Sequence, residues 1–148
     1  MAIIHNEITV NASIDAVWVM LANPELLDQY DPTVKKSTLI SPEKTGVGAK
    51  RKVTMMDGKN WFEEKITEFK PNEVLTYQLT ACSFPIKELK HGYSFEKAGN
   101  QTTIKQVMTY TVKFGLLGKL LDLLMIRKQS DKGIKKFFAG LKSYVETH

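Results

Sequence analysis

The strand register of this chain is set by residues 51–80, which read RKVTMMDGKNWFEEKITEFKPNEVLTYQLT. Apolar and polar residues alternate here with the period of two that is typical of half-buried strands. Two turn signals, Asp57-Gly58 and Pro71-Asn72, divide the stretch into three strands. Tight turns at these points place position 53 opposite 62, 51 opposite 64, 66 opposite 77 and 64 opposite 79. Both hairpins therefore turn the same set of residues to one face.

The same register extends over the flanking sequence. Turns near Phe84 and at Gly99-Asn100 place 77 opposite 91 and 93 opposite 106. With a first strand over 4–10, this predicts a seven-stranded antiparallel meander whose other strands cover 34–40, 48–56, 60–69, 73–82, 86–97 and 102–112. The face predicted to look inward carries Ala49, Arg51, Val53, Met55, Phe62, Glu64, Ile66, Leu75, Tyr77, Leu79, Leu89, His91, Tyr93, Phe95, Ile104, Gln106, Met108, Tyr110 and Val112. The face predicted to be exposed carries Lys50, Lys52, Lys65, Glu68, Thr76, Gln78, Lys90, Glu96 and Lys105.

Two helical regions flank the meander. Ser13 is an N-cap residue followed by apolar residues at helical spacing, and Asn23-Pro24 ends or kinks this short helical region. Residues 114–146 carry an apolar stripe that predicts one long helix on the concave side of the sheet. Residues 127–133 contain almost no apolar group, so we expect the helix to bend there. The predicted fold class is α+β.

The composition is that of a single globular domain over residues 1–148, with 43% hydrophobic and 25% charged residues. The longest apolar run, 114–126, contains Lys119 and Asp122 and is too short to cross a bilayer. Residues 1–10 lack the pattern of a secretory signal. Cys82 is the only cysteine, so no intrachain disulfide can form. We therefore expect a cytoplasmic protein.

Five local motifs occur in order along the chain: TVNASIDAVW at 9–18, YDPTV at 30–34, GVG at 46–48, EKITEFKP at 64–71 and YSFE at 93–96. Together with the order of the elements, they resemble the START-like superfamily (SRPBCC or Bet v 1-like proteins), which includes polyketide cyclases and dehydrases. The resemblance covers nearly the whole chain. It implies a helix-grip fold, in which a curved seven-stranded sheet, with two short helices after its first strand, wraps around a long C-terminal helix and leaves a cavity for an apolar small molecule. It implies no particular reaction, because the superfamily contains carriers, receptors and enzymes.

The predicted inner face contains charged and polar residues. Arg51 and Glu64 lie opposite each other, and a polar streak follows across the next three strands. A buried charge is costly unless it is paired or hydrated. Either these residues line a hydrated cavity, or they form a pair that only supports the fold. The residues that we expect to contact a ligand are Arg51, Phe62, Glu64, Tyr77, Leu79, His91, Tyr93, Gln106, Met108, Tyr110, Leu120 and Leu124.

His91 is the only histidine of the predicted interior, and His91 and Glu64 are the candidates for acid–base catalysis. Their backbones lie two strands and two positions apart, which is about 12 Å, so we expect no direct hydrogen bond between them. His91 is therefore expected to orient a ligand rather than to transfer protons. Cys82 is separated from His91 by roughly 17 Å of strand and is not expected to form a nucleophilic pair with it. The histidine spacing supports no zinc site, and we expect no metal or cofactor.

The net charge and the apolar segment 114–126 bear on which partners we expect. The formal net charge is +5, and six basic residues lie in the last 22 positions. They form either a solvated helix face or a contact with an anionic membrane surface. Residues 114–126 hold more large apolar side chains than one stripe can bury, so we expect them to form a mobile wall at the cavity entrance. Nucleic-acid binding is not expected, because lysines and aromatic residues fall on opposite faces. We expect a monomer or a weak dimer.

These observations favour a protein that binds or carries a hydrophobic or amphipathic small molecule, such as a lipid, a polyketide or an isoprenoid-like compound. Two other classes stay open. One is an enzyme of the cyclase or dehydrase type that works without a metal. The other is a module that binds a protein partner or assists an assembly.

Overall fold

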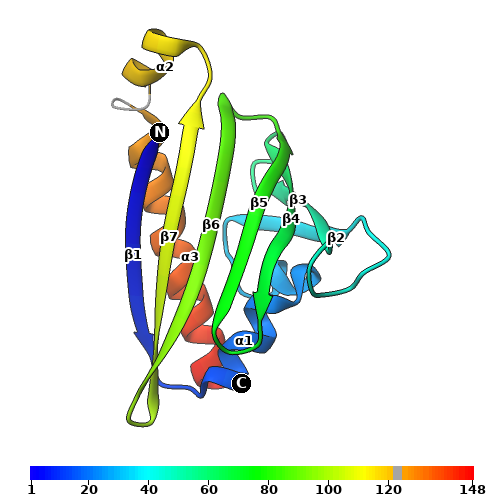
Figure 1. Ribbon diagram of the computed structural model, residues 1–148, viewed down its shortest axis with the longest axis vertical. Helices are drawn as coiled ribbons and strands as arrows, with labels where there is room; N and C mark the ends of the chain where they lie inside the picture. The colour runs from blue at the N-terminus through cyan, green and yellow to red at the C-terminus, as the bar shows by residue number, and fades with distance from the viewer. Residues whose placement is uncertain (122–124) are drawn as a thin grey trace.

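The computed structural model describes residues 1–121 and 125–148. Seven antiparallel strands form one sheet in the order β1-β7-β6-β5-β4-β3-β2. Short helices follow β1, and a long helix lies at the C-terminal end of the chain (Figure 1). The strands are β1 Ala2–Val10, β2 Val34–Leu39, β3 Lys50–Met55, β4 Trp61–Lys70, β5 Val74–Cys82, β6 Ile86–Ala98 and β7 Gln101–Val112. The helices are α1 Ile14–Ala22, the 3-10 helix η1 Pro24–Gln29, α2 Gly115–Leu121 and α3 Arg127–Thr147.

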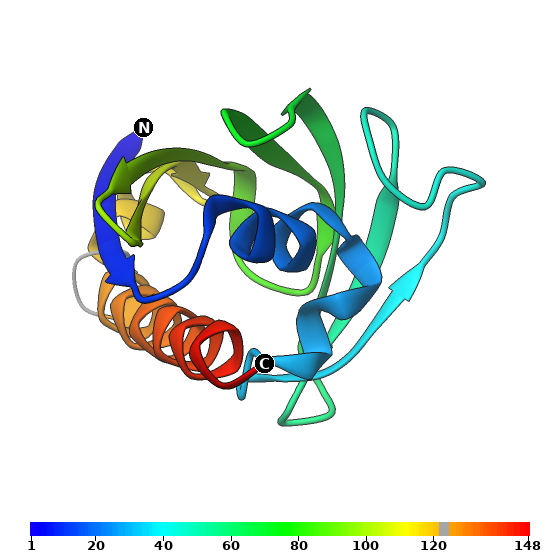
Figure 2. The same cartoon turned by 90° about the horizontal axis from the view of Figure 1, so that it is seen from below.

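The predicted register is confirmed in all four hairpins. Arg51 pairs with Glu64, and Ile66 with Tyr77. The remaining predicted pairs are Val53 with Phe62, Glu64 with Leu79, Tyr77 with His91, and Tyr93 with Gln106. The β4–β5 ladder shifts register between Glu63 and Glu64 and again between Ile66 and Glu68. Such irregularities bend a strand and increase its twist, and the sheet curves around α3 as predicted (Figure 2).

The short helix α1 begins and ends where the sequence predicts. The Ser13 hydroxyl accepts a hydrogen bond from the Ala16 amide at 3.2 Å, which satisfies one free N–H of the first turn. The helix ends at Ala22, and its C-cap residue Asn23 directly precedes Pro24. On its inner side, the Trp18 ring packs edge-on against Phe69 and Phe95, with ring centroids 5.2 and 5.6 Å away. This contact attaches α1 to the concave face of the sheet.

The helix α3 lies against this concave side and buries Phe137, Phe138, Leu141 and Val145. Its approach to the segment after η1 is very close at Gly140. A Cβ atom at that position would lie 1.9 Å from the Tyr30 carbonyl oxygen. Only glycine therefore fits at this contact without displacing the helix. None of the helices formed by the described residues is long and apolar enough to cross a membrane.

Some predictions differ from the structure. Within the predicted helix 114–146 the structure has two elements, α2 and α3, and residues 122–124 lie outside the described residues. The expected bend at 127–133 is wrong, because α3 runs through these residues without a break. The gap in the apolar stripe arises because Gln129 and Ser130 face a cavity, as described below, and not because the helix bends. Thr76 was expected to be exposed, but only 3% of its surface is accessible. It faces Gly92, which leaves room for it, and it donates a hydrogen bond to Glu68 at 3.0 Å.

Candidate functional site

A cavity of about 440 Å³ lies between the concave face of the sheet and α3. Its walls are mainly apolar, with Phe62, Phe84 and Met108 from the sheet side and Ile134 and Phe137 from α3. Eight of the predicted ligand residues line it: Arg51, Phe62, Glu64, Leu79, His91, Tyr93, Gln106 and Met108. About half of the inward face that the register predicts lines the cavity, and much of the rest, such as Val53, Ile66 and Leu75, is buried in the core.

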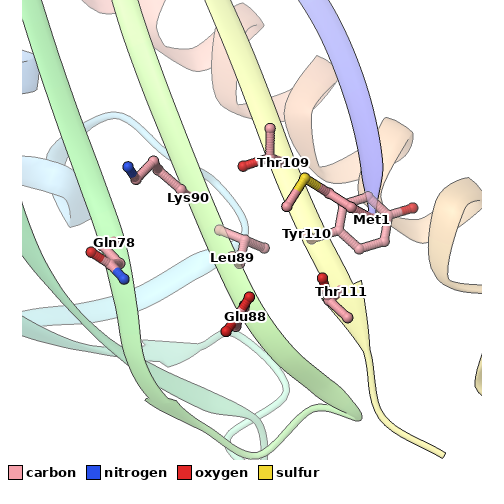
Figure 3. A pocket seen from close by; sticks show the side chains of 8 residues that line it. All are labelled: Met1, Gln78, Glu88, Leu89, Lys90, Thr109, Tyr110 and Thr111. Carbon is pink, nitrogen blue, oxygen red and sulfur yellow. The ribbon is translucent and has the colours of Figure 1, made fainter. Parts of the chain in front are cut away.

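Four predicted ligand residues are not brought to this cavity. Tyr77 is buried beneath its polar end, and Leu120 is 52% exposed on α2. Tyr110 lines a separate hollow of about 270 Å³ together with Met1 and residues of β5, β6 and β7 (Figure 3). Leu124 lies outside the described residues. The predicted ligand residues and the lining of this cavity therefore differ at Tyr77, Tyr110 and Leu120.

An ion pair forms the charged end of the cavity. Arg51 donates to Glu64 Oε1 through Nε at 2.7 Å and contacts the same oxygen through its second terminal nitrogen at 2.5 Å. Its other terminal nitrogen donates to the Pro24 carbonyl at 3.3 Å, and its guanidinium lies over the Tyr77 ring, 4.1 Å from the centroid. Only 4% of Arg51 and 1% of Glu64 are accessible. The expected compensation of the two charges is confirmed.

The pKa of Glu64 reflects these contacts. Burial raises the pKa of this carboxyl, but the charge of Arg51 and the hydrogen bonds from His91 and Arg51 outweigh it and lower the pKa to about 2. Burial lowers the pKa of Arg51, and the negative charge of Glu64 more than reverses that effect, so the net shift is upward. Both groups are therefore charged in the folded protein.

Glu64 and His91 are in direct contact, which contradicts the expectation from the sequence. His91 Nε2 lies 2.7 Å from Glu64 Oε2. The backbone spacing overstates the separation, because both side chains rise from the concave face of a curved sheet, where their ends converge. The register shift at Glu63 and Glu64 adds to this local bend. The two candidate acid–base residues thus belong to one cluster.

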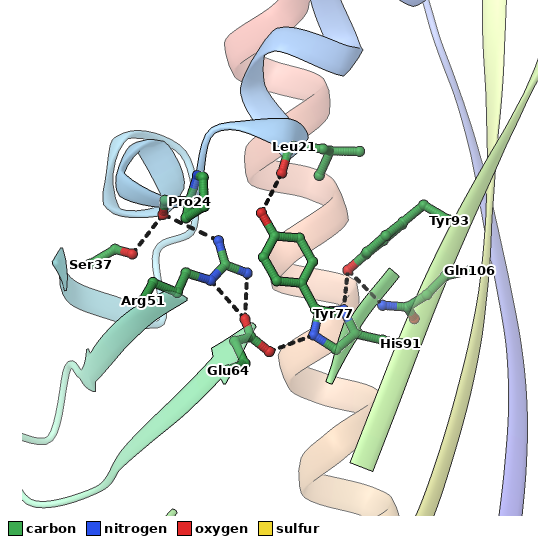
Figure 4. A network of polar contacts seen from close by, with 9 residues as sticks. All are labelled: Leu21, Pro24, Ser37, Arg51, Glu64, Tyr77, His91, Tyr93 and Gln106. Carbon is green, nitrogen blue, oxygen red and sulfur yellow. Dashed lines mark hydrogen bonds and ion pairs between the residues drawn. The ribbon is translucent and has the colours of Figure 1, made fainter. Parts of the chain in front are cut away.

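The cluster continues as a chain of hydrogen bonds across β6 and β7 (Figure 4). His91 Nδ1 lies 2.9 Å from the Tyr93 hydroxyl, and Gln106 Nε2 donates to the same hydroxyl at 3.0 Å. Asn6 Nδ2 donates to Gln106 Oε1 at 3.1 Å, which fixes the orientation of the Gln106 amide. Because ionised Glu64 can only accept a hydrogen bond, His91 Nε2 carries a proton and donates to it.

Tyr77 supports this cluster from below. Its ring stacks on His91, with centroids 5.3 Å apart and an angle of 10° between the planes. Its hydroxyl donates to the Leu21 carbonyl at 2.8 Å, and burial raises its pKa to about 12. Tyr77 thus holds both Arg51 and His91 in place and links them to α1. It positions the site without lining the cavity.

Asp31 is a charged cavity residue that the sequence reasoning missed. It follows η1, and its Oδ1 accepts hydrogen bonds from the Thr33 amide at 2.9 Å and the Thr33 hydroxyl at 2.7 Å. An Asp two residues before a Thr is a signal for such a turn, but nothing in the pattern places the turn at a cavity. Only 8% of Asp31 is accessible. The other missed lining residues include Leu27, Asn60, Gln129 and Ser130.

The arrangement suits binding better than proton transfer. Both ring nitrogens of His91 are occupied, by Glu64 and by Tyr93, so neither is free to accept a proton from a ligand. Cys82 lies at the end of β5, where its thiol contacts the carbonyls of Phe84 and Ile86. The site therefore presents an apolar chamber with one polar end whose hydrogen bonds are largely satisfied internally.

Comparison with known proteins agrees with this architecture. Residues 1–146 match a family described as polyketide cyclase/dehydrase and lipid transport. A protein from Thermus thermophilus is similar at a TM-score of 0.80 and 18% identity, with 97% of each chain covered. A START superfamily protein from Mycobacterium smegmatis gives 0.78 and 15%, covering 98% of this chain and 97% of that one. Ara h 8.0201 gives 0.79 and 17%, with 99% of each chain covered. The comparison with curated proteins finds no match.

Proposed function

Because the chain belongs to the polyketide cyclase/dehydrase and lipid transport family, we propose that it binds and carries an amphipathic small molecule in the cavity between the sheet and α3. This proposal rests on the cavity. Its volume of about 440 Å³ is within the range of small-molecule sites. Its apolar walls suit a hydrophobic body, and the cluster around Glu64 and His91 suits a polar end.

Binding of N-phenyl-1-naphthylamine, an uncharged fluorescent probe, tests this proposal. Met108 lines the cavity, whereas its neighbour Val107 points to the opposite face and is 41% exposed. We expect Met108→Trp to abolish probe binding, because the indole occupies the chamber, and Val107→Trp to leave it unchanged. A second pair, Leu79→Trp against Gln78→Trp, repeats the comparison on β5. If both inward variants fold and bind the probe as the native protein does, the cavity is not the binding site.

Native mass spectrometry addresses the natural ligand. Protein purified without denaturation is expected to carry a bound molecule that the folded Met108→Trp variant lacks. The same experiment separates a carrier from an enzyme. The enzyme alternative is supported by the family description, which includes cyclases and dehydrases. A carrier returns the bound molecule unchanged after incubation, whereas a cyclase or dehydrase returns one with altered mass or chromatographic retention.

The ligand is proposed to enter and leave at an anionic membrane surface. Five large apolar side chains are exposed around α2, each between 52% and 84%; this α2 patch consists of Phe114, Leu116, Leu117, Leu120 and Met125. Ile126, next to Met125, lines the cavity, so the patch adjoins the cavity wall. Basic residues flank it at Lys113, Lys119, Arg127 and Lys128. Apolar side chains among cations are the combination that binds anionic lipid interfaces.

Cosedimentation with vesicles tests the membrane contact. We expect the protein to bind phosphatidylglycerol-containing vesicles and not pure phosphatidylcholine vesicles. Leu116→Ser combined with Leu117→Ser is expected to abolish binding. The matched control is Val47→Ser combined with Met56→Ser, which removes two similarly exposed apolar side chains elsewhere. Equal binding by both double variants would exclude the α2 patch as the membrane contact, and a partner protein would then be the better explanation for it.

A further inference from the structure

The charges that line the cavity are unbalanced. Among the described lining residues, four carry a formal charge at neutral pH: Asp31, Arg51, Asp57 and Glu64. Arg51 and Glu64 neutralise each other at 2.5 Å. The two that are left, Asp31 inside the cavity and Asp57 in the exposed turn after β3, are both carboxylates. The cavity thus carries excess negative charge, although the whole chain has a formal net charge of +5.

The single cation of the wall cannot serve an anionic ligand. All three guanidinium nitrogens of Arg51 already contact Glu64 or the Pro24 carbonyl, and one face of the group lies on Tyr77. Two of the five N–H donors of the guanidinium are left by these contacts, but only 4% of Arg51 is accessible. A carboxylate or phosphate on the ligand would therefore have to compete with Glu64 for this charge and weaken the pairing of that buried carboxylate. Removing one partner of a buried pair is strongly unfavourable. An acidic polar end therefore has no counter-ion here.

Asp31, in contrast, has an oxygen available. Both hydrogen bonds from Thr33 end on Oδ1, and no group among the described residues donates to Oδ2. Burial raises the pKa of this carboxyl more than the Thr33 hydrogen bonds and the charge of Arg51 lower it. A buried carboxylate that lacks a cation is stabilised when one arrives. Asp31 is 8% accessible as a residue and lines the cavity, so the ligand can supply that cation.

Aromatic rings line the same cavity as this carboxylate. Phe137 lines the cavity, and its ring packs on Tyr30, the residue before Asp31, with centroids 5.7 Å apart. Tyr93 lines it too, with its ring 6.2 Å from that of Phe137. The faces of aromatic rings attract ammonium groups. The surroundings of Asp31 are thus suited to a positively charged group on an apolar body.

We propose that the ligand is an amphiphile whose polar end is a protonated amine, and that Asp31 binds this amine through its free oxygen. This inference rests on the proposed binding function and narrows its ligand class. It predicts a selectivity opposite to the one that the net charge of the protein would give. A basic protein attracts acids at long range, whereas this cavity selects amines at contact.

Displacement of N-phenyl-1-naphthylamine by three ligands with the same decyl chain tests the inference. Decylamine, decanol and decanoate are compared at neutral pH and physiological ionic strength, below the concentrations at which they form micelles. We expect decylamine to bind most tightly, decanol less tightly, and decanoate at least about tenfold more weakly than decylamine, which is the range for a hydrogen bond to a charged partner. Asp31→Asn is expected to remove this advantage of decylamine and leave decanol unchanged.

Glu25→Gln is the matched control, because Glu25 is an exposed carboxylate on η1 that does not line the cavity. It is expected to leave all three affinities as they are. The inference is overturned if decanoate binds the native protein as tightly as decylamine, or if folded Asp31→Asn keeps the preference for decylamine. Either result leaves the proposed binding function intact, since the uncharged probe still binds. If neither the probe nor any decyl ligand binds, both proposals fail. The ranking in the native protein decides the question even if Asp31→Asn does not fold.

Discussion

At the scale of single residues, the polar end of the cavity depends on charges that stabilise one another. Arg51 and Glu64 are almost fully buried, and Glu64 also accepts from His91. We expect Arg51→Leu to lower the free energy of unfolding by about 3–5 kcal/mol, because it leaves Glu64 charged and unpaired. The double variant with Glu64→Leu should lose less than the sum of the single variants. Urea unfolding of all four proteins measures this coupling.

The exposed pair Lys105–Glu96 is the control for that cycle, since its side chains are 45% and 61% exposed. Its coupling should be much smaller than that of the buried pair, because water and salt screen exposed charges. Additive losses at Arg51 and Glu64 would show that the buried contact contributes nothing specific to stability.

The depressed pKa of Glu64 makes stability depend on pH. Its pKa is about 2 in the folded protein against 4.5 for a free side chain. The stabilisation from Glu64 is therefore fully present above that ordinary value and is lost as the pH falls toward 2. Asp31, whose pKa is raised, acts in the opposite direction and offsets part of the loss. We expect the native protein to lose up to about 3 kcal/mol more over this interval than the Arg51→Leu/Glu64→Leu variant. Urea unfolding at a series of pH values measures the difference, and identical slopes would contradict it.

The residue pattern predicts this site in part. The shared register places Arg51, Glu64, His91 and Tyr93 on one face, because a period of two leaves no other choice once the turns are fixed. It does not predict that Glu64 touches His91, since that contact depends on curvature and side-chain reach rather than on strand spacing. Asp31 is missed for a different reason. It lies in a loop, where no periodicity relates it to the sheet.

At the scale of elements, the position of α3 depends on a close backbone contact at one glycine, Gly140. Gly140 lies against the Tyr30 carbonyl, and the neighbouring Asp31 belongs to the cavity wall. We expect Gly140→Ala to lower the free energy of unfolding by about 1–3 kcal/mol, because the added Cβ forces the helix away from this segment. Gly133→Ala, on the same helix, has nothing within 4 Å of its added Cβ. It should raise the free energy of unfolding by about 0.5–1 kcal/mol, the gain of alanine over glycine in a helix.

Thermal or urea unfolding of the two variants checks this contrast. Equal effects at both positions would mean that helix propensity alone matters and that the contact with Tyr30 relaxes freely.

The elements themselves differ in how far the sequence determines them. The strands are predicted to within about two residues of their bounds, because alternation and turn residues agree in every hairpin. The two elements α2 and α3 are not predicted separately, because residues 114–126 form one apolar run without a proline to end a helix.

At the scale of the whole molecule, the sheet and α3 enclose a chamber that their own side chains do not fill. An unfilled apolar space lacks packing contacts and so lowers stability. A ligand that fills the chamber can therefore raise the stability of the fold. The same curvature that opens the chamber brings Glu64, His91 and Tyr93 together at one end of it. Stability and binding are therefore linked through one feature, the distance between the concave face and the helix.

This linkage gives a prediction for the complete fold. A ligand that binds only the folded state at about 100 times its Kd should raise the free energy of unfolding by about 2.7 kcal/mol, which corresponds to an increase in Tm of roughly 5–10 °C for a domain of this size. Differential scanning calorimetry with increasing decylamine measures it. Val107→Trp should show the same increase, whereas Met108→Trp should show none, because its chamber is occupied. An equal shift in Met108→Trp would locate the stabilising ligand elsewhere, at the hollow beside Tyr110 or on the α2 patch. The cavity would then follow from the curvature of the sheet alone, without a role in binding this ligand.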